Sequence, residues 1–270
     1  MELLSRQKEL QLRRRKSDVL EDLPPKQVIH VPLSLLPEQY ETYARAEREG
    51  VLELRAKGLE LKIQHVLELI LRLKQVCNFC PRSGESAKLE ELRSRIKILD
   101  AEGHRALVFS QFTDDVFGVR ALARELAEFN PMVFVGSMSA SERDMAIQQF
   151  KVRTEHKVLI LSLRSGGVGL NLQEASYVFH FDRWWNPAIE RQAEDRSHRI
   201  GQTVPVTVFK YTLLGTIEER IHEILVLKQH LFDTIIDDVS LDIRTRLTAE
   251  EIFGLFGLER PPGEGRALRG

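Results

Sequence analysis

The sequence predicts an α/β fold in which a parallel sheet is covered by helices on both faces. From about residue 88, short runs rich in β-branched and aromatic residues alternate with amphipathic stretches. The runs are continuously apolar, which is typical of strands buried on both faces. Capping signals open several of the amphipathic stretches. Alternation of strand and helix in this way builds parallel sheets.

Length and composition indicate a globular protein. The chain has 270 residues, of which 43% are hydrophobic, and a formal net charge of −1. A balanced charge leaves a nucleic-acid partner open, because a local basic face can coexist with acidic surface elsewhere. No apolar run approaches the length of about 18 residues that would cross a bilayer, and the charged N-terminus is unlike a secretory signal. We therefore expect an intracellular protein without membrane contact, in the cytoplasm or nucleoid of a bacterium or the nucleus of a eukaryote.

The first 82 residues are predicted to form a connecting segment followed by a helical protrusion. Residues 1–36 contain a basic cluster and then Pro24 and Pro25, which favour extended chain. Residues 37–82 carry apolar residues at helical spacing as far as Val76. The pair Cys77 and Cys80 that follows has no second pair and no nearby His, so we expect reduced structural thiols rather than a metal or redox site.

Residues 83–230 are predicted to form the sheet domain, and residues 231–270 a small helical extension with a tail. The expected strands are 105–112, 131–135, 157–162, 177–181 and 204–212. The expected helices span 113–129, with Thr113 at its N-cap, and 139–150, with Ser139 and Glu142 as a capping box; a third opens at Asn186 and Pro187, and a fourth at Thr216 and Glu219. Ligands gather where parallel strands end, so the loops after Gln111, Val135, Ser162, Asp182 and Thr212 are the candidate site.

A glycine-rich loop follows the strand at 157–162. Its glycines, Gly166, Gly167 and Gly169, allow backbone amides to approach a phosphate without a Cβ in the way. A tight turn without a ligand is the alternative.

Two tryptophans follow the strand at 177–181, in "FDRWWNPAIERQ". Trp184 is expected to pack against the sheet. For Trp185 and Arg183 the sequence leaves two interpretations open, namely packing or contact with nucleic acid by stacking and by phosphate binding.

The stretch "QAEDRSHRIGQ" carries the most unusual pattern. If it is helical, Gln192, Arg196 and Arg199 share one face, which is cationic where a core helix would be apolar. A solvated surface with Arg191, Asp195 and Arg199 at helical spacing is the alternative. We expect His198 to pack or donate a hydrogen bond rather than act as a base, and Asp195 to orient the neighbouring arginines.

In their order along the chain, these pieces resemble a known family. "ALVFSQF", "VGSMSASERDMAIQQF", "VLILSLRSGGVGLNL" and "FDRWWNPAIERQAEDRSHRIGQ" are similar to the motifs of the second RecA-like lobe of superfamily-two helicases. "WWNPA" followed by "QAEDRSHRIGQ" resembles the Swi/Snf-type DNA-dependent ATPases rather than RNA helicases. The resemblance covers most of the chain and implies a RecA-like parallel sheet with an inserted helical protrusion and a helical C-terminal tail.

The chain departs from that family in one respect. It contains no Gly-Lys dipeptide and no Asp-Glu dipeptide, so the phosphate loop and the acidic magnesium box are absent. The resemblance places both on a first RecA-like lobe, which would be the partner of this lobe and would hold most of the ATP and Mg²⁺. The chain alone is therefore predicted to be inactive.

The resemblance also implies roles for individual residues. Arg196 and Arg199 would be arginine fingers, and Gln192, Gly167 and Gly169 would contact the nucleotide. Backbone contacts to double-stranded DNA are implied at Ser110, Gln111, Gly136, Ser137, Ser139, Ser165, Gly166 and Trp185. The predicted function is the second motor lobe of an ATP-dependent duplex-DNA translocase or remodelling ATPase. The alternatives are an RNA helicase lobe and a non-catalytic protein-binding module.

Overall fold

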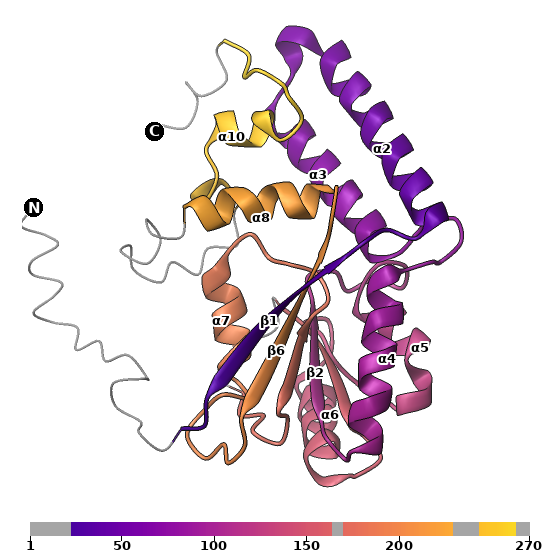
Figure 1. The fold of residues 1–270 in the computed structure, drawn as a ribbon, viewed down its shortest axis with the longest axis vertical. Coiled ribbons are helices and arrows are strands. Elements are labelled where there is room, and N and C mark those ends of the chain that lie inside the picture. The colour runs from indigo at the N-terminus through magenta and orange to yellow at the C-terminus, as the bar shows by residue number, and fades with distance from the viewer. Residues whose placement is uncertain (1–22, 164–169, 229–242, 263–270) are drawn as a thin grey trace, which may run out of the picture.

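The computed structural model describes residues 23–163, 170–228 and 243–262. In this part of the chain, six parallel strands form one sheet in the order β1-β6-β5-β2-β4-β3 (Figure 1). The bounds are β1 Lys26–Leu33, β2 Ala106–Ser110, β3 Met132–Phe134, β4 Val158–Ser162, β5 Tyr177–His180 and β6 Val206–Leu213. The predicted α/β class with a parallel sheet is confirmed.

One strand was not predicted. Residues 26–33 lie in the segment expected only to connect, yet β1 pairs with β6 along its whole length, from Lys26 opposite Val206 to Leu33 opposite Leu213. The two prolines before it favour extended chain, and β1 lies at the edge of the sheet, where Pro32 is tolerated because one side of the strand needs no ladder partner. Half-exposed residues along β1 gave no continuous apolar run to signal it.

Helices cover both faces of the sheet. Their bounds are α2 Pro37–Ala56, α3 Ile63–Asn78, α4 Ala87–Ala101, α5 Val119–Glu125, α6 Ala140–Val152, α7 Pro187–Glu194, α8 Ile217–Leu227 and α10 Ala249–Gly254. Alternate residues of β2 face opposite sides: Leu107 and Phe109 belong to one apolar cluster, and Val108 to the other. Helices α4 and α5 pack into the cluster of Val108, whereas α6, α7 and α8 pack into that of Leu107.

Three of the predicted caps are confirmed. Ser139 and Glu142 form a reciprocal capping box at the start of α6. Asn186 accepts from the amide of Ala188 at the start of α7, and Thr216 accepts from Glu218 at the start of α8. These bonds satisfy amides that a helix start leaves without partners.

The expected helix at 113–129 is much shorter, and Thr113 is not its cap. The Asp114 carboxylate accepts from the amides of Val116 and Phe117, which holds this stretch as a turn, and α5 begins at Val119. A Cβ on Gly118 would lie 2.3 Å from the carbonyl carbon of Phe112, so the chain folds back on itself there. Short local bonds of Asp compete with helix formation, and here they win.

The predicted helical protrusion is a hairpin of two helices. Its pattern, continuous in the sequence as far as Val76, is broken between α2 and α3 by a short turn that includes Gly58–Glu60. Gly50 allows the close approach, because a Cβ there would be 2.3 Å from Leu69 Cδ1. Further along the chain, α10 packs on the same hairpin, with Ile252 and Phe253 fully buried (Figure 1).

Candidate functional site

The loop after β2 is held from behind by Asp182. This fully buried carboxylate accepts from Ser110 Oγ at 2.5 Å and from the amide of Gln111 at 3.0 Å. Ser110 is fully buried and Gln111 is 8% exposed. The hydroxyl of Ser110 is committed to Asp182, and the DNA contacts expected at Ser110 and Gln111 stay predictions. In the part of the chain that the structure describes, Gln111 Nε2 is buried without a hydrogen-bond partner.

The loop after β3 is open to solvent. Gly136, Ser137 and Ser139 are all exposed. They lie at the carboxyl edge of the sheet, on the same edge as Ser110 and Gln111, because the strands are parallel. Their accessibility and their backbone amides suit contacts to phosphate.

Two arginines beside this loop were missed by sequence reasoning. Arg120 of α5 is exposed and its Nη2 lies 3.5 Å from Ser137 Oγ, and the guanidinium of Arg143 on α6 lies 6.0 Å from the ring of Phe134. Their positions in two helix patterns gave no functional signal. Only the fold brings them to the serine loop, where they add positive charge.

The remaining loop of this edge follows β4. Ser165, Gly166, Gly167 and Gly169 lie outside the described residues, so their contacts stay predictions.

The tryptophan pair is largely buried. Trp184 is 2% exposed, which confirms its packing role, and Trp185 is 8% exposed. The two rings lie 4.5 Å apart, and Lys74 Nζ lies 5.1 Å from the ring of Trp185. Stacking of Trp185 on DNA stays a prediction that requires the ring to leave this packing.

Arg183 is occupied by an internal ion pair. Its Nε and Nη2 donate to the two oxygens of Glu190 at 2.9 and 3.2 Å, and Lys210 donates to the same carboxylate at 2.9 Å. Glu190 is fully buried. Burial alone would raise the pKa of Glu190, but Arg183 and Lys210 hold it well below its usual value. A phosphate contact by Arg183 is thus not what this structure shows.

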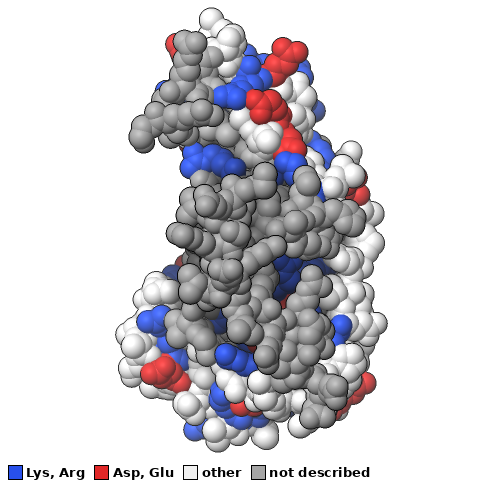
Figure 2. Space-filling model, turned by 90° about the vertical axis from the view of Figure 1, so that its left-hand side faces the viewer, with Lys and Arg blue, Asp and Glu red and all other residues white. Residues whose placement is uncertain are grey.

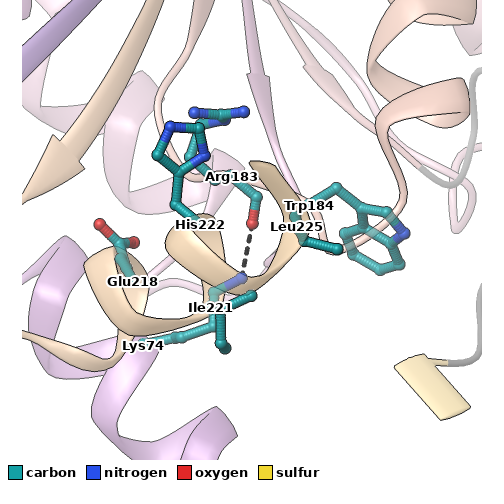
Figure 3. Close-up of a pocket in the computed structure, with 7 residues that line it drawn as sticks. All are labelled: Lys74, Arg183, Trp184, Glu218, Ile221, His222 and Leu225. Carbon is teal, nitrogen blue, oxygen red and sulfur yellow. Dashed lines mark hydrogen bonds between the residues drawn. The ribbon is translucent and has the colours of Figure 1, made fainter. Parts of the chain in front are cut away.

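Lys74, near the C-terminal end of α3, is another buried ionisable residue beside this site. Its ammonium donates to the carbonyl of Arg183 at 2.6 Å, across a small pocket that Glu218 and His222 of α8 also line (Figure 3). Burial lowers the pKa of Lys74, and Asp182 and Glu218 oppose that shift. The hairpin is thus tied to the carboxyl edge of β5 by a buried cation.

Gln192, Arg196 and Arg199 lie near the other edge of the sheet. Helix α7 ends at Glu194, so the expected single helical face is wrong: only Gln192 lies on the helix. The amides of Arg196 and Ser197 bond three residues back, which tightens the chain into turns. Gln202 stabilises this loop by donating to the carbonyls of Gln173, Ala175 and Ser197.

Contacts of this loop place it at the amino ends of the strands. His198 Nε2 lies 2.8 Å from the carbonyl of Pro24, two residues before the start of β1, so the expectation that His198 packs or forms a hydrogen bond is confirmed. In Figure 1 the chain that leaves α7 reaches the start of β6 at the lower edge, whereas β1 and β6 end near α2 and α8 above. The arginines therefore do not line the carboxyl-end crevice where we expected ligands.

The two arginines have different environments. Arg199 and Gln192 are exposed, whereas Arg196 is 5% exposed. Burial, reinforced by the nearby charge of Arg199, lowers the pKa of Arg196 to about 10, so it remains a cation at neutral pH. Two neighbouring guanidinium groups repel each other, and an anion between them would relieve that repulsion. Figure 2 shows the side of the molecule that lies on the left in Figure 1, with Lys and Arg side chains above and below its centre.

The two cysteines lie in the interior of the described structure. Cys77 and Cys80 are both free and buried, as expected for structural thiols. Burial raises the pKa of the Cys77 thiol, which makes it unreactive. The described residues contain no cluster of three or more His, Cys, Asp or Glu side chains placed to bind a metal ion. None of the helices described has the length and apolar character needed to cross a membrane.

Comparison with known proteins decides the family. The helicase conserved C-terminal domain matches residues 87–201, and the SNF2-related domain matches residues 1–81. A Bacillus subtilis protein named as an ATP-dependent helicase/translocase is 37% identical over 262 residues, which are 92% of this chain. The chain belongs to the Swi/Snf-type helicase family. It spans only 28% of the length of that relative.

Other relatives agree with this assignment. The mouse SWI/SNF-related matrix-associated actin-dependent regulator of chromatin subfamily A member 1 is 34% identical over 85% of this chain and 23% of its own length. The Sulfolobus solfataricus SWI2/SNF2 ATPase core solved with dsDNA has a TM-score of 0.67 and 31% identity, over 96% of this chain and 56% of its own. This Swi/Snf-type lobe therefore has the RecA-like fold of SWI2/SNF2 ATPase C-terminal regions.

Proposed function

We propose that this chain is the second motor lobe of an ATP-dependent translocase on double-stranded DNA. The observation that supports this best is that two polar surfaces lie at opposite edges of one sheet. Polar loops lie at its carboxyl edge, and the arginines Arg196 and Arg199 lie toward its amino edge. A lobe built in this way can hold DNA and complete a nucleotide site at the same time.

The proposed partner of the arginines is ATP held mainly by a first RecA-like lobe. Phosphoryl transfer spreads negative charge over the γ-phosphate oxygens, and an arginine supplied by a facing surface accelerates it by about 10³–10⁵-fold. Arg199 is exposed and would reach across, whereas Arg196, buried and still charged, would fix the geometry. Gln192 on α7, with Gly167 and Gly169, would add hydrogen bonds to the nucleotide. Mg²⁺ is assigned to the first lobe.

The proposed partner of the carboxyl edge is the DNA backbone. Gln111 offers an amide donor, and Gly136, Ser137 and Ser139 form an exposed polar loop flanked by Arg120 and Arg143. Ser165, Gly166 and Trp185 complete the predicted contacts. Contacts by backbone amides, small hydroxyls and arginines read no sequence, which suits a motor that must move along any duplex.

Motion follows from the division of the nucleotide site. ATP contacted by both lobes stabilises the closed arrangement more than the open one, and hydrolysis removes that difference. DNA held by both lobes would then be advanced in small steps.

The test is ATP hydrolysis by the complete polypeptide with duplex DNA, single-stranded DNA or RNA. We expect duplex DNA to give the largest stimulation, and the 270-residue chain alone to show no hydrolysis above background. Stimulation by RNA alone would favour an RNA helicase lobe. The absence of stimulation by any nucleic acid would favour a protein-binding module, and magnesium-dependent hydrolysis by the isolated chain would contradict the division of the site.

A further inference from the structure

The carboxylate of Asp182 joins the helical hairpin to the loop after β2. Beyond its bonds to Ser110 and the Gln111 amide, its Oδ2 accepts from Asn78 Nδ2 at 3.0 Å. Asn78 is the last residue of α3 and is fully buried. One carboxylate therefore fixes the end of the protrusion and the first peptide after β2 relative to each other.

The same asparagine extends the network to two more helices. Asn78 Oδ1 accepts from Lys88 Nζ of α4 at 3.1 Å, and Lys88 forms an ion pair with Glu218 of α8 at 2.6 Å. Both side chains of that pair are fully buried. The other N–H of the Asn78 amide group reaches the carbonyl of Phe117 at 3.0 Å, in the turn that leads into α5. Asn78 thus has no freedom to rotate without breaking a buried bond.

Charge in this network is balanced. Lys74 and Lys88 supply two positive charges, and Asp182 and Glu218 supply two negative ones. An incompletely satisfied buried network costs more than an apolar core of the same shape. Removing charged groups from water costs free energy even when they are paired. The protein nevertheless keeps these buried charged groups at the junction between the hairpin and the predicted DNA edge.

We propose that Asp182 is a positioning residue through which the α2–α3 hairpin sets the strength of the DNA contact at Gln111. Asp182 is buried and does not touch DNA itself. It holds the Ser110–Gln111 peptide, and with it the base of the Gln111 side chain, whose Nε2 is buried without a partner among the described residues and would turn outward to reach the DNA backbone. A load or partner acting on the hairpin would then change the grip on the backbone. This inference rests on the proposed function.

The informative variant is Asn78→Ala, because it removes the link to α3 and leaves Asp182 with Ser110 and Gln111. In the complete polypeptide we expect the duplex-DNA concentration for half-maximal ATPase stimulation to rise by about five- to tenfold, with little change in turnover at saturating DNA. We also expect the backbone amide hydrogen of Gln111, which is bonded to Asp182, to exchange with solvent faster. Asn78→Ser, which keeps a small polar group, serves if Asn78→Ala does not fold.

Val66→Ala is the matched control. Val66 is a fully buried apolar residue of α3, twelve positions before Asn78, and belongs to the apolar cluster. It should lower the stability of the hairpin without changing the DNA concentration dependence or the exchange of Gln111. An equal effect of both variants would show that only stability matters, and would overturn the proposal.

Gln111→Ala separates this inference from the function on which it rests. If Gln111→Ala weakens the DNA response and Asn78→Ala does not, the positioning role of Asp182 is wrong and the DNA edge stands. If Gln111→Ala has no effect although duplex DNA stimulates hydrolysis, the contact at Gln111 is wrong and the positioning proposal is wrong with it. If duplex DNA does not stimulate the wild-type protein, the proposed function itself is wrong.

Discussion

The two edges of the sheet are built in contrasting ways. At the carboxyl edge, the loop after β2 is fixed by a buried, charge-balanced network around Asp182, and short loops present amides and hydroxyls. Toward the amino edge, a turn-rich loop exposes Arg199 and buries its neighbour Arg196. At the first edge the Asp182 carboxylate has all its hydrogen-bond partners within this chain. At the second edge the Arg199 side chain is exposed to solvent. Under the proposed function, the DNA contacts would be preorganised within this chain, while the nucleotide site would depend on a second lobe.

Helix α7 connects the two edges and carries a charge network of its own. Glu190 binds Arg183 and Lys210, and one helical turn later Glu194 binds Lys210 at 2.8 Å and Lys26 at 2.7 Å. Both carboxylates are almost completely buried. The helix that precedes the arginines is therefore anchored to β1, β5 and β6, so the arginine loop starts from a fixed point.

The largest effect that would test the contrast is at Arg199. Because this exposed arginine is proposed to act only on the transition state, Arg199→Ala in the complete polypeptide should lower DNA-stimulated turnover by about 10³-fold or more, with the free energy of unfolding nearly unchanged. Arg191→Ala, at another exposed arginine of the same segment, is the matched control and should retain normal turnover. If turnover of the Arg199→Ala variant stays within about twofold of normal, Arg199 does not act as an arginine finger.

The next effect concerns the helix between the edges. Glu190→Gln leaves Arg183 without its buried counter-charge and Lys210 with Glu194 alone, so we expect the free energy of unfolding to fall by about 3 kcal/mol. Urea denaturation measures it. The exposed pair of Arg153 and Glu155 gives the control, because solvent screens this pair and Glu155→Gln should leave the free energy of unfolding nearly unchanged. Equal costs at both positions would show that α7 is not anchored by this network.

The same network predicts how stability depends on pH. Burial alone would raise the pKa values of Glu190 and Glu194, but attractive charges hold both below their ordinary value of 4.5 in the folded protein. Their contribution is therefore fully present above about pH 5 and is lost as the pH falls below the unfolded pKa toward the folded one. Unfolding free energies measured from pH 7 to pH 3 should decline, and Glu190→Gln should decline less steeply. A parallel decline in both proteins would contradict the assignment.

Much of this architecture could be predicted from the sequence. Continuous apolar runs identified five of the strands, and the caps at Ser139 and Thr216 fixed the starts of two helices, because these signals are local. Strand β1 was not predicted, because an edge strand need not be apolar on both faces. The end of α7 before Arg196 was not predicted either. The turns that follow α7 are stabilised by hydrogen bonds from Gln202 to Gln173 and Ala175, which lie far from it in the sequence.

The site was harder to predict than the fold. Motif order gave Arg196 and Arg199, but their position near the amino edge follows from chain direction through α7, not from their spacing. Asp182, Asn78 and Lys88 gave no individual signal, because their roles arise from contacts between residues distant in sequence.

The smallest effects should appear in the serine loop, and they sharpen the contrast within the carboxyl edge itself. Ser139→Ala removes the cap of α6 and should cost about 1 kcal/mol of stability, whereas Ser137→Ala should change it by less than about 0.5 kcal/mol, because Ser137 is exposed and caps no helix. Duplex-DNA binding at low salt should weaken in both, by about two- to fivefold, since each loses one hydroxyl available to phosphate. Thr248→Ala, which removes the matching capping box of α10, controls for lost helix caps and should leave DNA binding unchanged. If it weakens binding as much as Ser139→Ala does, the loop after β3 acts through stability alone, and the DNA contacts of this edge would have to lie elsewhere along it.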